Sequence, residues 1–189
     1  MEEKIVYEGF VKVKEVPVNI KDNVHIYNEI CVKDAVAAIL IDENGKYGLV
    51  TQYRPLAKSN TKEIVAETLD KENLTPYETL VEGLKEEAGI EESEILFSSK
   101  EPIFEYCMMI GCSNSKISIY EIFVKAQENK EINDTEVEYV EWVTLEEFKT
   151  LVNNKEIKDS KTLLAYYYLL SKTLEEEKNI AGDDKNIIA

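Results

Sequence analysis

The sequence predicts an α/β protein in which a mixed β-sheet is sandwiched between helices. Three observations support this fold class. Strand-like segments are interleaved with two or three helical segments along the 189 residues. The run AVAAILI at 35–41 is apolar throughout, as expected for a strand that is buried on both faces. Residues 76–88 place apolar side chains at helical spacing between a start signal and a stop signal.

The N-terminal half is predicted to be rich in β-structure. Residues 4–32 contain two or three strand-like stretches ahead of the buried strand. ENGK at 43–46 predicts a hairpin turn, because Asn-Gly tolerates positive φ, and 47–53 would pair back across it. We expect a loop at 55–62 and a short strand at 63–67.

The helix predicted at about 76–88 has an acidic side. Thr75 and Glu78 form a capping-box pattern, Pro76 suits the first turn, and Gly89 ends the helix. The side away from the core carries Glu78, Glu82, Glu86 and Glu87. Carboxylates at this spacing repel one another unless a cation lies among them. The helix alone is compatible with a solvated acidic face or with a metal-binding face.

The second half of the chain is predicted to add more strands and two helices. The strands are expected near 101–110, 116–125 and 136–143. Thr144 and Glu147 predict a capped helix after the last strand, and Asp159 or Ser160 would cap the final helix. Residues 175–189 are highly charged, so we expect a disordered tail there.

Composition excludes several functions. Lys plus Arg total 22 and Asp plus Glu total 38, so the net charge is −16, which argues against nucleic acid or an anionic membrane as the main partner. The three cysteines form no CxxC pair, which favours a reduced, cytoplasmic protein. The N-terminus lacks a signal-peptide pattern, and the longest apolar run is too short to cross a bilayer. His25 is the only histidine, so a multi-histidine metal site is not expected.

Four segments, in the right order, resemble one known superfamily. LKEEAGI at 84–90 is similar to the end of the Nudix box, Arg-Glu-apolar-any-Glu-Glu-any-Gly-apolar. QYR at 52–54, EIVAE at 63–67 and the helical segment 155–170 look like parts of the ADP-ribose pyrophosphatase-like group of that superfamily. The resemblance implies a Nudix-type α/β/α sandwich with a mixed β-sheet and an N-terminal β-rich extension.

The resemblance also implies a domain organisation. Residues 1–33 would form a β-rich segment used for dimerisation, and 34–174 would form the Nudix-like domain, followed by the tail at 175–189. The expected assembly is a homodimer, in which the N-terminal strands contribute to the partner's pocket. The expected small-molecule partner is nucleotide-like.

The box departs from the family pattern at several positions. Aligned back from Gly89, the family's Arg falls on Glu82 and its first catalytic Glu falls on Gly83. Its earlier Glu falls on Leu74. With EIVAE at 63–67 as the guide, and one extra residue in the loop at 68–73, the box-opening Gly falls on Glu67. The positions that match are Glu86, Glu87, Gly89 and Ile90. The framework is therefore kept while polar positions of the site are lost.

The resemblance assigns roles to the residues that remain. Glu86 and Glu87 would be catalytic residues that hold Mg²⁺ or Mn²⁺, with the Ala66 carbonyl as a further metal ligand. Glu82, one turn before Glu86, is the candidate to replace the carboxylate missing at Gly83.

Three further residues complete the predicted site. Among Asp134, Glu136 and Glu138, Glu136 is the preferred acidic residue of the later loop. Arg54 and Glu63 would bind substrate. The alternative for Arg54 is an ion pair with Glu63 and no contact with a ligand.

Two functions therefore stay open. One is a Mg²⁺- or Mn²⁺-dependent pyrophosphatase of ADP-ribose or nucleoside-diphosphate-sugar type, with impaired or altered catalysis because Gly83 replaces a catalytic Glu. The other is a non-catalytic Nudix module that binds a nucleotide-like ligand or a protein partner.

Overall fold

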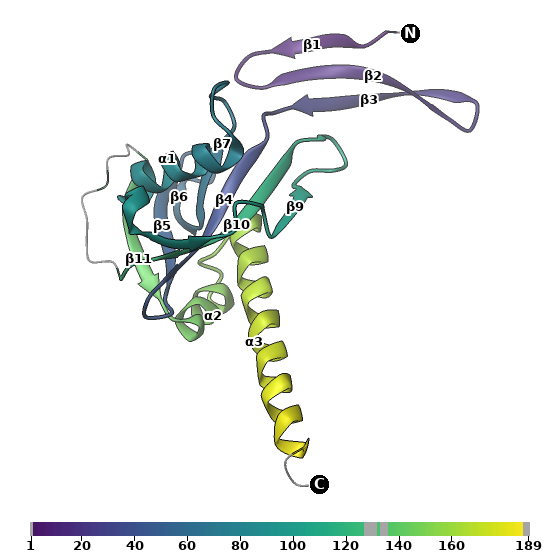
Figure 1. Cartoon of the computed structure of the whole chain (residues 1–189). Coiled ribbons are helices and arrows are strands. Elements are labelled where there is room, and N and C mark those ends of the chain that lie inside the picture. Colours follow the sequence, from purple (N-terminus) through teal and green to yellow (C-terminus); the bar gives the residue numbers. More distant parts are fainter. Residues whose placement is uncertain (1, 127–131, 133–135, 187–189) are drawn as a thin grey trace.

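The computed structural model describes residues 2–126, 132 and 136–186. Its body is built on a mixed sheet in the order β11–β5–β4–β10–β8 (Figure 1). These strands are β4 (Ala35–Asp42), β5 (Tyr47–Arg54), β8 (Ile95–Ser98), β10 (Lys116–Val124) and β11 (Val137–Val143). Three shorter strands, β6 (Ser59–Glu63), β7 (Val65–Thr68) and β9 (Phe104–Cys107), pair with β5, β4 and β10. β4 and β10 are parallel and the other pairs are antiparallel.

Helices cover both faces of this sheet. Alternate residues of β4 point to opposite sides, so Val36 and Leu40 pack with α1 (Pro76–Ala88), whereas Ile39 packs on the other side. That other side is covered by α2 (Leu145–Asn153) and by the buried part of α3 (Ser160–Asn186). The predicted α/β/α sandwich with a mixed sheet is confirmed.

The box-like helix has the predicted ends. Thr75 Oγ1 accepts a hydrogen bond from the Glu78 amide at 3.2 Å, and the Thr75 amide donates to the Glu78 carboxylate at 2.8 Å. Gly89 adopts a left-handed conformation with φ of 63°, where a side chain would be strained. Leu80 and Leu84 are fully buried and hold the helix on the sheet.

One sequence expectation was wrong, and one strand was missed. Residues 59–63 form β6 instead of belonging to a loop, because Thr61 and Glu63 alternate inward with polar partners that replace an apolar core. β8 was not anticipated, since its strand is short and half exposed. Helix α3 continues through residue 175 to Asn186, within the segment expected to be a tail, and residues 187–189 lie outside the described residues.

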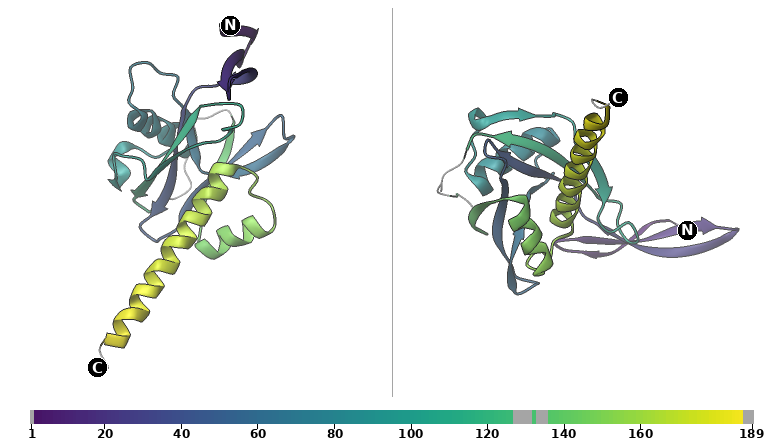
Figure 2. Two further views of the ribbon diagram at one scale, coloured as in Figure 1. Left: turned by 90° about the vertical axis from the view of Figure 1, so that its right-hand side faces the viewer. Right: turned by 90° about the horizontal axis from the view of Figure 1, so that it is seen from below.

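A separate three-stranded sheet extends from the body (Figure 1). It is an antiparallel meander of β1 (Lys4–Glu8), β2 (Lys12–Ile20) and β3 (Asn23–Cys31). The Ile30 amide donates to the Cys112 carbonyl at 2.7 Å and ties its base to the body. Figure 2 shows that this sheet and α3 both reach well beyond the sandwich. Within the described residues, no helix combines the length and apolar character needed to cross a membrane.

The Thr75 cap gives a first prediction. Thr75→Ala removes the acceptor for an amide in the first turn of α1, so it should lower the free energy of unfolding by about 1 kcal/mol. Chemical denaturation followed by circular dichroism measures this change. Asn73→Ala, an exposed change in the preceding loop, is the control. Equal stability of the two variants would contradict a capping role for Thr75.

Candidate functional site

The candidate site lies where β7 approaches α1. Glu87 is buried to 9% exposure, and its Oε2 accepts a hydrogen bond from the Ala66 amide at 3.4 Å. This contact brings the acidic side of the helix against β7, as the family resemblance implied. Glu86, the neighbouring candidate ligand, remains exposed. The structure therefore brings Ala66 and Glu87 together and leaves Glu86 open to solvent beside them.

Gly83 is buried, and its missing side chain leaves room that another residue fills. A Cβ atom built on Gly83 would lie 2.1 Å from Cγ, 2.9 Å from Cδ and 2.7 Å from Oε1 of Glu67. The Glu67 side chain, which comes from β7, therefore lies directly over this glycine. Sequence reasoning assigned no role to Glu67.

A lysine lies among the exposed carboxylates of α1. Lys71 Nζ is 2.5 Å from Glu82 Oε2 and 3.9 Å from Glu86 Oε1. The hydrogen bond to Glu82 raises the pKa of Lys71, and the negative charges of Glu86 and Glu67 act in the same direction. Glu82, predicted to replace the missing metal ligand, is thus an ion-pair partner of Lys71 in this structure.

The oxygen donors at this junction are of the kind that Mg²⁺ and Mn²⁺ prefer, namely carboxylates and a backbone carbonyl. Across the described part of the chain, no three His, Cys, Asp or Glu side chains converge in an arrangement that could hold a metal ion. The cation that these carboxylates meet here is the Lys71 ammonium. Metal binding would require Glu82 or Glu86 to exchange Lys71 for the metal.

Glu136 lies at the edge of β11, opposite β5. Its Oε2 accepts a hydrogen bond from Gln52 Nε2 at 3.0 Å, and its side chain is otherwise exposed. Glu138, the alternative, accepts a bond from Asn60 at 3.0 Å. Asp134 lies outside the described residues.

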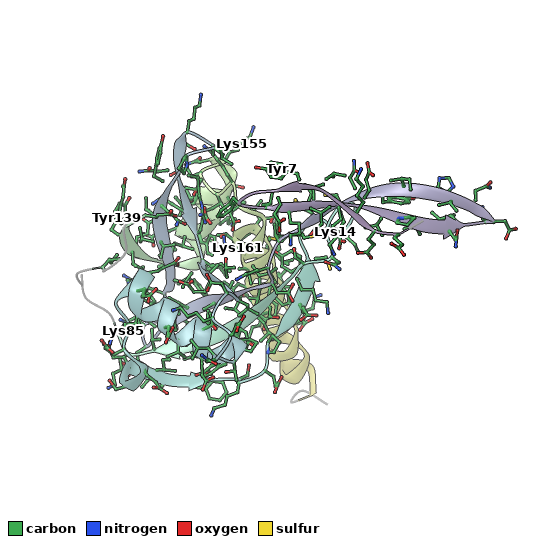
Figure 3. The ribbon with its side chains drawn as sticks, turned by 90° about the horizontal axis from the view of Figure 1, so that it is seen from above. Tyr7, Lys14, Lys85, Tyr139, Lys155 and Lys161 are labelled. Atoms are coloured by element: carbon green, nitrogen blue, oxygen red, sulfur yellow. The ribbon has the colours of Figure 1, made fainter. Side chains whose placement is uncertain are left out.

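Arg54, which is partly exposed, forms an ion pair with the buried carboxylate of Glu63. Arg54 donates from Nε and Nη2 to the two Glu63 oxygens at 2.8 and 2.7 Å, and Lys161 Nζ donates to Glu63 at 2.6 Å. Thr61 Oγ1 adds a fourth bond at 2.5 Å. Lys161 lies inside the body in Figure 3, whereas Lys85 of α1 lies at its surface. The ion pair weighed for Arg54 from the sequence is present, and the Arg54 side chain still keeps 41% exposure.

These cations control the ionisation of Glu63. Burial by itself would raise the pKa of this carboxyl group. The hydrogen bond from Arg54, the charge of Lys161 and the bonds from Lys161 and Thr61 outweigh burial and lower the pKa to about 2. Sequence reasoning paired Glu63 with Arg54 but missed Lys161, which is 98 residues away and meets Glu63 only through the fold.

With this geometry in place, comparison with known proteins identifies the family. Residues 32–167 match the NUDIX domain model, so the chain belongs to the Nudix family. The ADP-ribose pyrophosphatase of Bacillus subtilis (strain 168) is 29% identical to this chain over 147 residues, which is 76% of each protein. The resemblance inferred from the four motif segments is confirmed.

The Glu63 network gives a second prediction. The lowered pKa means that Glu63 contributes stability above its unfolded value near 4.5, and that this contribution is lost as the pH falls through about 2. Glu63→Gln leaves Arg54 and Lys161 without their carboxylate, so it should cost about 3 kcal/mol of unfolding free energy at pH 7. The variant should also lose less stability than the wild type between pH 4.5 and 2.

Urea denaturation across this pH range measures both effects. Glu72→Gln, which removes an exposed carboxylate, is the matched control and should follow the wild type. A Glu63→Gln curve parallel to that of the wild type would contradict the charge network.

Proposed function

We propose that this Nudix protein is a Mg²⁺- or Mn²⁺-dependent pyrophosphatase of a nucleoside diphosphate linked to a second group, with ADP-ribose as the first substrate to test. The observation that carries the proposal is the β7–α1 junction, where the buried Glu87 is held by the Ala66 amide next to Glu86. The name of the Bacillus subtilis relative supports the substrate class. The net charge of −16 disfavours nucleic acid as an alternative partner.

The proposal gives each residue a task. Glu86, Glu87 and the Ala66 carbonyl would hold the metal. A bound divalent metal would neutralise pyrophosphate oxygens and lower the pKa of the attacking water. Glu136, fixed by Gln52, would accept a proton from that water. Water would form a new bond to one phosphorus as the bridging P–O bond breaks, which yields AMP and ribose 5-phosphate from ADP-ribose.

Arg54 would contact the anionic end of the substrate. It is the only arginine of the chain, and a −16 protein needs a local positive group to hold a phosphate. Its guanidinium can keep the Glu63 pair and meet a ligand through its exposed part, since the pair is bidentate and the side chain is 41% exposed.

One observation favours the second function, a non-catalytic module. Lys71 already neutralises Glu82 and lies within 3.9 Å of Glu86, so an internal cation occupies part of the acidic side. If this arrangement persists in solution, a nucleotide-like ligand would bind without requiring metal. Metal dependence therefore separates the two functions.

The third prediction tests activity directly. With Mg²⁺ or Mn²⁺, the wild type should convert ADP-ribose to AMP and ribose 5-phosphate more slowly than a Nudix chain with the full box, because Gly83 carries no carboxylate. Glu87→Gln should lower the rate about 100-fold, as expected for loss of a metal-holding group. Glu72→Gln should leave it unchanged.

These rates are measured by chromatographic separation and quantification of AMP at successive reaction times. No product formation with either Mg²⁺ or Mn²⁺, together with thermal stabilisation by ADP-ribose in the absence of metal, would contradict the hydrolase proposal and support the binding module.

The proposal includes a homodimer assembled through the N-terminal sheet and a cytoplasmic location. The sheet leaves six apolar side chains about half exposed: Ile5, Val6, Tyr7, Val24, Ile26 and Tyr27. A three-stranded sheet with apolar residues on both faces is best stabilised by a second copy. All three cysteines are free thiols, which fits a reducing compartment.

The fourth prediction concerns this assembly. Light scattering at micromolar concentration should give twice the 21.7 kDa chain mass. Ile26→Asp places a charge on the exposed apolar face of β3 and should shift the mass toward the monomer. Asn23→Asp, at the start of the same strand, should not. A monomeric wild type would contradict the proposal.

A further inference from the structure

We propose that Glu67 supplies the metal-binding carboxylate that Gly83 removes from α1. The two departures from the Nudix pattern then form one exchange: an acid stands on β7 where the box has its opening glycine, and a glycine stands on α1 where the box has an acid. This inference rests on the proposed function, because it requires a divalent cation at the β7–α1 junction.

The register of β7 directs Glu67 toward the helix. Strand side chains alternate, so Val65 and Glu67 point to the same face of the sheet. Val65 is fully buried in the cluster that also contains Leu80 and Leu84 of α1. The Glu67 side chain therefore points to the face of the sheet that α1 covers, two residues after the buried Val65.

The distances show that Glu67 and a side chain at 83 exclude each other. A Cβ at Gly83 would lie 2.1 Å from Glu67 Cγ, far inside the contact distance of two carbon atoms. With the Glu67 side chain in this position, residue 83 has room only for glycine. The Glu67 carboxylate, with Oε1 2.7 Å from that Cβ position, occupies the region that a glutamate side chain leaving position 83 would enter.

The helix geometry places this region beside the retained ligands. Position 83 lies one turn before Glu87 and three residues before Glu86, so side chains from all three positions share one side of α1. Glu87 is itself held by the Ala66 amide, which belongs to the residue preceding Glu67. The Glu67 carboxylate therefore lies toward the same side of α1 as a glutamate that would leave position 83.

Negative charges from β7 and from α1 surround Lys71. Its Nζ lies 2.5 Å from Glu82 Oε2 and 3.9 Å from Glu86 Oε1, and the charge of Glu67 also acts on this lysine. The carboxylates of strand and helix therefore act on one cation together. The competing explanation is that Glu67 serves only as a counter-charge for Lys71, and metal binding distinguishes the two.

The first test measures Mn²⁺ binding to the full-length protein by calorimetry and by electron paramagnetic resonance. Glu67→Gln keeps the size of the side chain and removes its charge, and it should weaken Mn²⁺ binding about tenfold or more. Glu72→Gln, which removes an equal charge from the nearby exposed loop, should bind as the wild type does. Melting temperatures without metal verify that both variants are folded.

The outcomes separate this inference from the proposed function. Mn²⁺ binding by the wild type and by Glu67→Gln with equal affinity would overturn the role of Glu67 and leave the metal-dependent function standing. No Mn²⁺ binding by the wild type would overturn both.

The second test is a double-mutant cycle on the exchange itself. Glu67→Gly should weaken Mn²⁺ binding because the carboxylate is lost, and Gly83→Glu should lower the melting temperature because two side chains compete for one space. The double variant, which has the family arrangement, should recover Mn²⁺ affinity to within about threefold of the wild type. Additive losses in the double variant would overturn the inference.

Discussion

The close approach of β7 to α1 at Gly83 is the constraint on which the rest of the site depends. The helix has no side chain at this position, and the Glu67 side chain of β7 takes the space that a Cβ would need. Leu80 and Leu84, one on each side of Gly83 along the helix, are fully buried and hold α1 close against the sheet. Glu87 can then reach the Ala66 amide across the same junction. A bulkier residue at 83 would disturb packing and chemistry together.

A second constraint is the buried Glu63 of β6, which links β5 to the start of α3. The two hydrogen bonds from Arg54 and the one from Lys161 neutralise the negative charge of this buried carboxylate. The only arginine of a chain with net charge −16 is therefore fixed in position before any ligand arrives. Such preorganisation reduces the entropy lost when an anionic ligand binds. Structural and ligand-binding roles of Arg54 are thus compatible.

Much of this fold could be predicted from the sequence because capping residues, turns and apolar runs act over short stretches of the chain. Capping residues and Gly89 set the bounds of α1, and the uninterrupted apolar run predicted β4 as the central strand. β6 was missed because its inward residues are Thr61 and Glu63, whose burial depends on cations from distant segments. The box alignment found that positions 67 and 83 both depart from the pattern. Their contact could not be read from spacing, since it requires the register of β7 against the helix.

In the site that we propose for this Nudix protein, one metal-binding carboxylate comes from β7 instead of from the helix that the motif specifies. A motif that lacks an acidic residue can therefore belong to a protein in which another strand or helix supplies that carboxylate. The most direct measurement is anomalous diffraction from crystals soaked in Mn²⁺. The account predicts a peak about 2.1 Å from a Glu67 carboxylate oxygen, the distance of a hard octahedral cation, with Glu86 or Glu87 as a second ligand. A peak coordinated without Glu67, or no peak at the β7–α1 junction, would contradict it.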